Sequence, residues 1–284
     1  MQLGIFAKTF QRPTLAQTLD AVVEHGFDCI QFNFACVGLP SMPEQIAPEI
    51  AEHIAREMSR RGISLAAVSG TFNMIHPDPA KRQDGLRRLA AMAQVCRLLN
   101  TSTITLCTGS RDPENMWRSH PLNRSPEAWR DLIASLSTAL EMTEATGVTF
   151  GIEPETANVI DSAANARKLL DEIKSPRLKI ILDAANLFLP GDKHRMKSII
   201  DEAVDLLADD IIAAHAKDFL DNGATVEHVA AGKGMLDYGY YVTKLRSAGF
   251  SGPLILHGLE ENEISDSRRF VQAAVASSGR EHVL

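Results

Sequence analysis

Short runs of apolar and β-branched residues alternate along the whole chain with longer stretches in which apolar residues recur every three or four positions. A buried parallel strand reads as a short continuous apolar run, and an amphipathic helix shows the 3.6-residue period. Eight runs of the first kind occur, at residues 3–7, 29–33, 64–69, 103–108, 148–153, 178–183, 211–215 and 253–257. The pattern therefore predicts a repeating unit of one strand followed by one helix.

The stretches between these runs carry helix boundary signals. Leu15, Leu19 and Val22 share one face of the first helix, and Gly26 follows it, as is typical of the position after a helix end. Further helices are predicted at residues 49–61, 125–147, 162–173 and 240–248. Strands that alternate with helices in this way favour a parallel sheet covered by helices.

Eight such units in 284 residues favour a closed (β/α)₈ TIM barrel over an open doubly wound sheet. An open nucleotide-binding sheet normally carries a glycine-rich phosphate loop, and the sequence has neither GxGxxG after the first run nor GxxxxGK[ST]. We therefore predict one α/β TIM-barrel domain over residues 1–284. An extended loop after the fourth strand, at about 109–126, contains Arg111, Trp117, Arg118 and His120 and could cover the barrel mouth.

Composition narrows the class of protein. Hydrophobic residues make up 45% of the chain, which is enough for a large core, and the net charge of −7 argues against nucleic acid as a partner. The four cysteines lack CxxC spacing, as in proteins with reduced thiols. No run approaches the roughly 18 apolar residues of a membrane helix, and Lys8 and Arg12 follow the first apolar run instead of preceding it as in a signal peptide. These features predict a soluble cytoplasmic protein with no membrane partner.

Ionisable side chains stand at the ends of the last four predicted strands: Glu153, Asp183, His215 and His257. The carboxyl ends of barrel strands converge on one mouth, where active sites are built. One such residue alone is more often a helix cap or a hydrogen-bonded structural group. Here four ionisable residues stand at the ends of successive strands, and a buried charge needs a partner. Together they predict one divalent metal ion. Mixed carboxylate and imidazole ligands suit Mn²⁺, Co²⁺, Fe²⁺ or Zn²⁺ better than Ca²⁺.

Several segments then occur in a fixed order: FNMIHPD (72–78), GIEPE (151–155), ILDAAN (181–186), HAKD (215–218), and GKGMLD (232–237) ahead of SGPLILHGLEE (251–261). In this order and spacing the chain resembles the sugar phosphate isomerase/epimerase group of the xylose isomerase-like TIM barrel superfamily, over nearly its whole length. Members of that group bind a divalent metal through a strand-5 Glu, a strand-6 Asp, a strand-7 His and a strand-8 Glu. They move protons between neighbouring carbons of a ketose or aldose.

Carried over by position, Glu153, Asp183 and His215 match the first three ligands, whereas His257 stands where members place the strand-8 glutamate. A neutral imidazole bound to a metal cannot take a proton from a substrate, so the resemblance implies Glu153 as the catalytic base. Glu260 could supply a second carboxylate from the following loop. The alternative for Glu260 is a solvated loop acid.

The resemblance also implies residues that contact the substrate. His76 matches a position near the substrate, and Asn186 stands where members often carry a histidine. Lys217 follows the strand-7 histidine, and Lys233 between two glycines could contact an anionic group. Lys8, just after the first strand, could reach a substrate oxygen or phosphate. For each of these residues a purely structural role in a turn, a loop ion pair or a solvated surface is the alternative.

The function implied is that of a metal-dependent isomerase or epimerase of a small sugar or keto-sugar, which transfers a proton through a metal-stabilised enediolate. A homodimer or homotetramer is expected, and manganese is among the candidate metals. Two alternatives remain: a metal-dependent lyase or deglycosylase, in which one base suffices, and a non-catalytic metal-binding subunit. A DNA-repair endonuclease of the same superfamily would need several metals and a basic groove, which the acidic composition disfavours.

Overall fold

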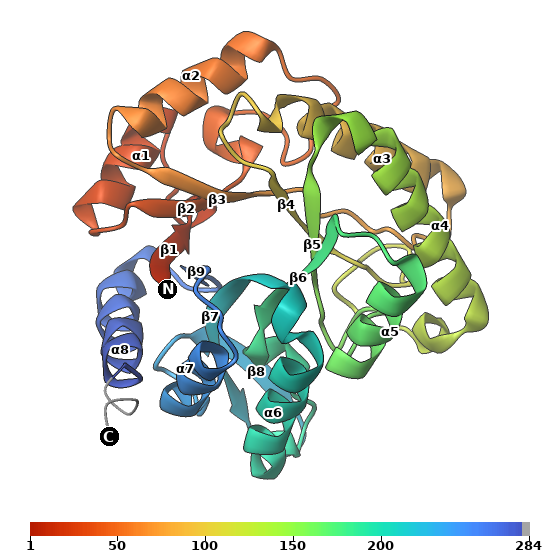
Figure 1. Ribbon diagram of the computed structural model, residues 1–284, viewed down its shortest axis with the longest axis vertical. Helices are drawn as coiled ribbons and strands as arrows, with labels where there is room; N and C mark the ends of the chain where they lie inside the picture. The colour runs from red at the N-terminus through yellow and green to blue at the C-terminus, as the bar shows by residue number, and fades with distance from the viewer. Residues whose placement is uncertain (280–284) are drawn as a thin grey trace.

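The computed structural model describes residues 1–279, which contain a closed barrel of eight parallel strands (Figure 1). The ring runs in chain order and closes because the last barrel strand pairs with the first, with Leu3 opposite Leu254. The strands are β1 (Gln2–Phe6), β2 (Cys29–Phe32), β3 (Ser64–Ser69), β4 (Thr103–Cys107), β5 (Thr149–Glu153), β6 (Leu178–Asp183), β7 (Ile211–Asp221) and β9 (Pro253–Leu256). The predicted TIM barrel is confirmed.

Helices surround this barrel (Figure 1). They are α1 (Leu15–Glu24), α2 (Pro48–Ser59), α3 (Pro79–Cys96), α4 (Pro126–Met142), α5 (Ala163–Ile173), α6 (Met196–Leu207), α7 (Tyr238–Ser247) and α8 (Ile264–Ser277). Side-chain caps define several starts: the side chain of Thr14 accepts from Gln17 N, and that of Ser125 from Ala128 N. Within residues 1–279, no helix combines the length and the apolar character that crossing a bilayer requires.

One strand continues well past the segment that the apolar pattern predicts. β7 runs on from His215 to Asp221 and forms an antiparallel hairpin with β8 (Val226–Ala230). The carboxylate of Asp218 accepts hydrogen bonds from the backbone amides of Gly232 at 3.0 Å and Leu236 at 2.9 Å. A Cβ atom on Gly234 would lie 2.3 Å from Asp218 Oδ1, so this close wrapping needs glycine there. The HAKD and GKG segments are therefore one structural unit.

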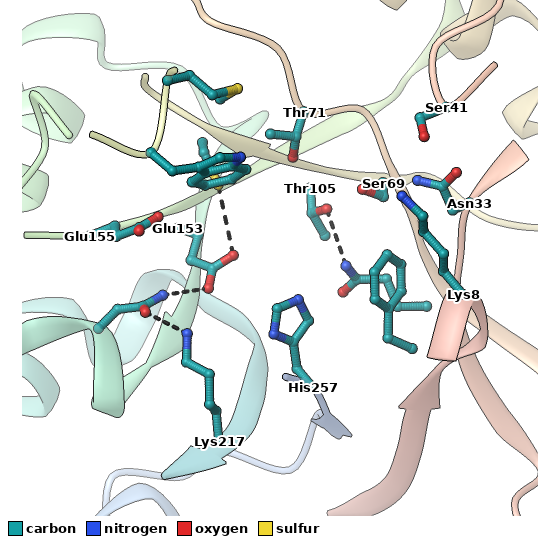
Figure 2. Close-up of a pocket in the computed structure, with 16 residues that line it drawn as sticks. Lys8, Asn33, Ser41, Ser69, Thr71, Thr105, Glu153, Glu155, Lys217 and His257 are labelled. Atoms are coloured by element: carbon teal, nitrogen blue, oxygen red, sulfur yellow. Dashed lines mark hydrogen bonds between the residues drawn. The ribbon is translucent and has the colours of Figure 1, made fainter. Parts of the chain in front are cut away.

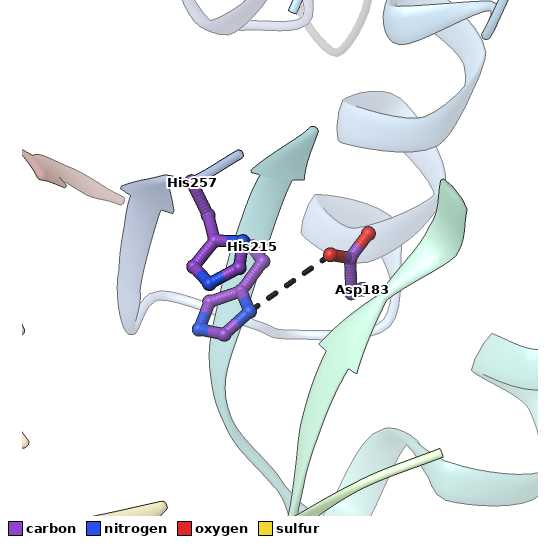
Figure 3. A group of neighbouring side chains, drawn as sticks. All are labelled: Asp183, His215 and His257. Atoms are coloured by element: carbon purple, nitrogen blue, oxygen red, sulfur yellow. Dashed lines mark ion pairs between the residues drawn. The ribbon is translucent and has the colours of Figure 1, made fainter. Parts of the chain in front are cut away.

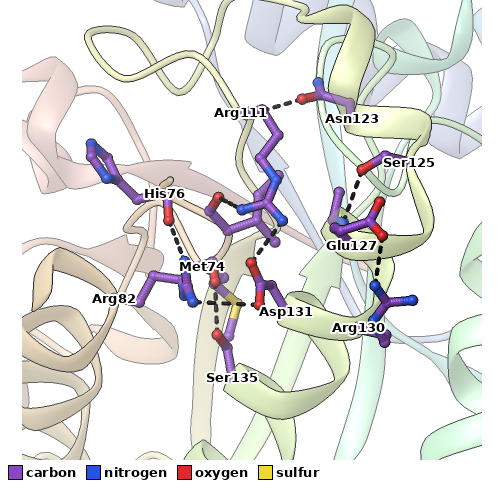
Figure 4. A network of polar contacts seen from close by, with 12 residues as sticks. Met74, His76, Arg82, Arg111, Asn123, Ser125, Glu127, Arg130, Asp131 and Ser135 are labelled. Carbon is purple, nitrogen blue, oxygen red and sulfur yellow. Dashed lines mark hydrogen bonds and ion pairs between the residues drawn. The ribbon is translucent and has the colours of Figure 1, made fainter. Parts of the chain in front are cut away.

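The segment between β4 and α4 is tied to the loop after β3 (Figure 4). Arg111 pairs with Asp131 of α4 (Nη2–Oδ2, 2.7 Å) and donates to the carbonyl oxygen of Ile75 at 2.9 Å. Arg82 donates to the carbonyl oxygen of His76 at 2.6 Å and lies 3.4 Å from the other oxygen of Asp131. Because two partly buried guanidinium groups hold both loops, the rim of the barrel at β3 and β4 is firmly positioned.

Candidate active site

A cavity of about 380 Å³ opens at the carboxyl ends of the barrel strands (Figure 2). Two kinds of side chain line it on opposite sides. Glu153 and Glu155 come from the end of β5 and Lys217 from β7, whereas Lys8, Asn33 and Ser69 come from the ends of β1, β2 and β3. Phe6, Met116 and Trp117 add apolar surface. A concave site with convergent polar groups is typical of small-molecule binding.

Three of the predicted ligands form a tight cluster (Figure 3). Asp183, His215 and His257 each offer a ligand atom, and these atoms lie within 4.8 Å of one another. Barrel register explains the proximity: Asp183 of β6 stands opposite His215 of β7, and His257 directly follows β9. The two imidazole rings stack with centroids 4.9 Å apart, and Phe6 covers the other face of His257 at 5.4 Å.

Glu153, the fourth predicted ligand, lies against this cluster. Its Oε1 atom accepts from His215 Nδ1 at 3.2 Å and from Asn186 Nδ2 at 2.7 Å. Asn186 in turn accepts at Oδ1 from Lys217 Nζ at 2.6 Å. The structure thus brings Glu153, Asn186 and Lys217 into one hydrogen-bonded chain beside the cluster, and all three line the cavity.

The chemistry of these residues fits a divalent cation. Within residues 1–279, the buried atoms His257 Nδ1 and Asp183 Oδ2 have no hydrogen-bond partner. Such atoms carry a desolvation cost that a bound cation would remove. Among the described residues, Asp183 Oδ2 is compensated by ion pairs alone, with Lys217 Nζ at 3.2 Å and with His215 Nδ1 at 3.9 Å. Carboxylate and imidazole ligands together match zinc or another first-row metal, so the cluster could hold such an ion.

Gln31 of β2 fixes the orientation of His215, a role that sequence reasoning missed. Gln31 Oε1 lies 2.9 Å from His215 Nε2, and an amide oxygen can only accept. Nε2 therefore carries a proton, and Nδ1, which donates to Glu153 and also faces Asp183, carries the other. Burial lowers the pKa of His215, but the negative charge of Glu153 outweighs it and raises that pKa. The available signal was a buried glutamine inside an otherwise apolar strand, CIQF.

Burial and neighbouring charges set the protonation of the cluster. Burial by itself would raise the pKa of Glu153, but the charge and hydrogen bond of His215, with His257 and Lys217, lower that pKa to about 2. Burial, followed by the charge of His215, lowers the pKa of His257 to about 4. At neutral pH, Glu153 is therefore ionised and His257 neutral, which are the forms that bind metals.

Glu155 is a second carboxylate in the cavity that the sequence did not single out. It follows Glu153 by two residues and lines the same cavity. Burial, and then the negative charge of Glu153, raise the pKa of Glu155 to about 7. The sequence GIEPE is equally compatible with an exposed Glu155 and with a Glu155 that lines a cavity. Only the fold decides between these positions.

The raised pKa of Glu155 should make stability depend on pH. A carboxyl group whose pKa is higher in the folded than in the unfolded state stabilises the fold fully below the unfolded pKa, near 4.5. That contribution is lost as the pH rises through about 7, at about 1.4 kcal/mol per pKa unit. In EDTA-treated protein, we therefore expect the free energy of unfolding of the wild type, relative to Glu155→Gln, to fall between pH 4.5 and 7. A constant difference over this range, measured by urea unfolding, would contradict the raised pKa.

The family model described as xylose isomerase-like TIM barrel matches residues 19–274. The chain belongs to this family. No sequence among curated proteins matches it significantly.

Solved structures similar to this xylose isomerase-like barrel include two sugar epimerases. The 3-keto-D-glucoside 4-epimerase YcjR from E. coli has 17% identity and a TM-score of 0.76, over 96% of this chain and 99% of that one. An L-ribulose 3-epimerase has 16% identity and a TM-score of 0.76, over 99% and 97% of the two chains. The IolI protein with a bound zinc atom has 15% identity and a TM-score of 0.72, over 99% of both. At these identities the similarity establishes the shared fold.

Three residues predicted to contact the substrate, His76, Lys233 and Glu260, are not among the described residues that line the cavity. The ring of His76 accepts from Asp78 N at 3.0 Å and contacts the carbonyl oxygen of Pro113 at 3.1 Å, so it joins two rim loops. Lys233 is half exposed and lies 4.0 Å from Asp266. Among residues 1–279, neither side chain lines the cavity. The backbone amide of Gly232, beside Lys233, is already bound by the carboxylate of Asp218, so it is not available to an anion there.

Glu260 also stays outside the cavity as far as the described residues show. It precedes the short 3₁₀ helix at Glu261–Glu263, where its side chain and that of Glu263 form a capping box. The side chain bonds to the helix start, which leaves it unable to supply a second carboxylate to the site. The extended loop after β4 does contribute: Met116 and Trp117 line the cavity, while Arg118 pairs with Asp112.

Proposed function

We propose that the chain is a metal-dependent sugar isomerase or epimerase that moves a proton between neighbouring carbons of a keto-sugar. One observation carries this proposal: Glu153, Asp183, His215 and His257 converge at one side of a cavity large enough for a sugar. The epimerases among the similar structures support the reaction class, and the zinc atom bound to IolI supports a metal. One ion of manganese, cobalt, iron or zinc is expected.

The roles of the chain's own residues follow from their contacts. Asp183, His215, His257 and Glu153 would hold the metal, whose chemistry is to stabilise negative charge on a carbonyl oxygen when a neighbouring carbon is deprotonated. Glu153 is the base, kept ionised by its surroundings and oriented by Asn186. Because its pKa is low, its strength as a base depends on the substrate proton being acidified.

The test is exchange of carbon-bound protons with solvent. EDTA-treated protein, before and after addition of Mn²⁺, is incubated in D₂O with D-fructose, D-tagatose, L-ribulose and a 3-keto-D-glucoside, and NMR follows the protons next to the carbonyl. We expect exchange of at least one sugar, only after metal addition. Equal exchange without metal would contradict the metal dependence. Saturable sugar binding without any exchange would instead favour a non-catalytic binding subunit.

A lyase or deglycosylase is the second candidate, and His257 is the observation that favours it. His257 occupies the strand-end position where an isomerase of this group has its second glutamate. Epimerisation removes a proton from one face of a carbon and returns one to the opposite face, and the second glutamate that would serve the opposite face is missing here. One base is enough for elimination. The same NMR spectra distinguish the two reactions, because elimination gives an unsaturated product and loss of a substituent, whereas epimerisation gives an isomer of equal mass.

A further inference from the structure

The side of the cavity formed by β1, β2 and β3 carries hydrogen-bond donors that have no partner among residues 1–279 (Figure 2). Lys8 follows β1, Asn33 follows β2, Ser69 ends β3, and Ser41 lies in the loop after Val37; all four line the cavity. Since β1, β2 and β3 are successive neighbours in the ring, these ends meet on one side. Across the barrel, β5, β6 and β7 supply Glu153, Asp183 and His215.

Lys8 is a cation with no protein partner among residues 1–279: no ion pair and no hydrogen bond engages its ammonium group. The other lysine of the cavity, Lys217, is bound to Asp183 and Asn186. None of the cavity residues supplied by β1, β2, β3 and their following loops is acidic. The positive charge of Lys8 is therefore free to act on whatever enters the cavity.

The side-chain amide of Asn33 is a second hydrogen-bond donor on the same side of the cavity as Lys8. Its side chain is only 4% exposed, and its Oδ1 atom accepts from the backbone amide of Ala35 at 2.9 Å. The amide nitrogen of Asn33 must then face the cavity, and within the described part of the chain it donates to nothing. An ammonium group and an amide NH₂ can only donate, so their best partner is an oxygen that only accepts.

We propose that Lys8, with Asn33, Ser41 and Ser69, binds a carboxylate group at the end of the substrate remote from the metal cluster, so that the substrate is a sugar acid. The inference rests on the proposed function for the reacting end of the same cavity. One ammonium, one amide and two hydroxyl groups can donate hydrogen bonds to all the acceptor positions of a carboxylate. A neutral sugar carries no negative charge to pair with the ammonium group of Lys8. A phosphate dianion would find a single cation here and no free helix amide, because Asn33 already occupies Ala35 N.

Binding of matched probes tests the site without relying on turnover. D-Gluconate and D-sorbitol differ only in a carboxylate in place of a hydroxymethyl group, and inorganic phosphate probes the other anion. Calorimetric titrations use the metal-loaded wild type, Lys8→Met, Lys8→Arg, and Lys233→Met as a control for loss of a lysine outside the cavity. Lys8 has no partner in the described structure, so Lys8→Met should leave the thermal unfolding midpoint unchanged.

We expect wild-type protein to bind gluconate about tenfold or more tightly than sorbitol, as the loss of one charge-assisted hydrogen bond implies. Lys8→Met should remove this preference without changing sorbitol binding, Lys8→Arg should restore much of it, and Lys233→Met should behave as wild type. Equal binding of both probes, no saturable gluconate binding, an equal loss of both in Lys8→Met, or tighter binding of phosphate than of gluconate would each overturn the proposal.

The two proposals fail separately. If keto-sugars exchange their protons but gluconate shows no Lys8-dependent preference, the anion site is wrong and the isomerase stands. If gluconate binds through Lys8 but neither neutral nor acidic keto-sugars exchange protons, the site stands and the reaction class is wrong.

Discussion

Glu153→Gln is expected to abolish exchange of the substrate's carbon-bound proton with solvent while the protein keeps its metal. The substitution keeps the shape of the side chain and an oxygen that can accept from Asn186 and His215. It removes the negative charge that takes the proton, and general-base catalysis of this kind is worth about 10²- to 10⁴-fold in rate. The measurement is the exchange rate in D₂O, with metal content determined on the same sample.

Glu141→Gln is the matched control, because Glu141 lies exposed near the end of α4 and is not among the residues that line the cavity. This variant should keep the full exchange rate. Exchange that persists at the wild-type rate in Glu153→Gln would show that another group removes the proton, and Glu155 would be the next residue to replace. Loss of both metal and exchange would instead show that Glu153 acts mainly as a ligand.

Asp183→Asn is expected to lose the metal and to destabilise the protein at the same time. Loss of a residue that merely supports a ligand costs roughly 10- to 100-fold in metal affinity, so removing a ligand charge should cost at least that. Asp183 is completely buried and pairs with Lys217, which is 6% exposed. Without the carboxylate, the ammonium group is left in a buried site at a cost on the order of 3 kcal/mol. Elemental analysis and urea unfolding measure the two effects.

The double variant Asp183→Asn/Lys217→Met separates them. Removing the unpaired ammonium should recover most of the lost stability, but metal should remain absent. His257→Ala, analysed beside it, reports whether the buried imidazole is itself a ligand: metal should fall there too, without the loss of an ion pair. Retention of about one metal per chain in Asp183→Asn would contradict the cluster as a metal site.

The barrel could be predicted from the sequence because its signal is local. Each of the eight predicted apolar runs overlaps a barrel strand, and helix starts such as Thr14 and Ser125 carry their own caps. The hairpin of β7 and β8 could not be predicted in this way. Lys217 and Asp218 interrupt the apolar run, and their burial is stabilised by Asn186, Asp183 and backbone amides that lie far along the chain.

The site shows the same division. Glu153, Asp183 and His215 were found because strand ends in a barrel must meet, and they do approach one another. Glu260 and Lys233 were placed by proximity in sequence to a motif, and local bonds hold both outside the cavity. Gln31 was marked only as a polar residue within an apolar strand, and Glu155 only as the second glutamate of GIEPE; the contact of Gln31 with His215 and the burial of Glu155 come from the fold.

The sequence by itself determined the order of strands and helices and the residues that stand at the strand ends, since both depend on patterns within a few residues. Only the tertiary structure decided which side chains share a charge environment: the low pKa of Glu153, the high pKa of Glu155 and the ammonium of Lys8 across the cavity from the acids. The physical reason is that burial and electrostatic interaction depend on distances through space, so that Glu153 responds to His215, 62 positions along the chain, and to His257, 104 positions along.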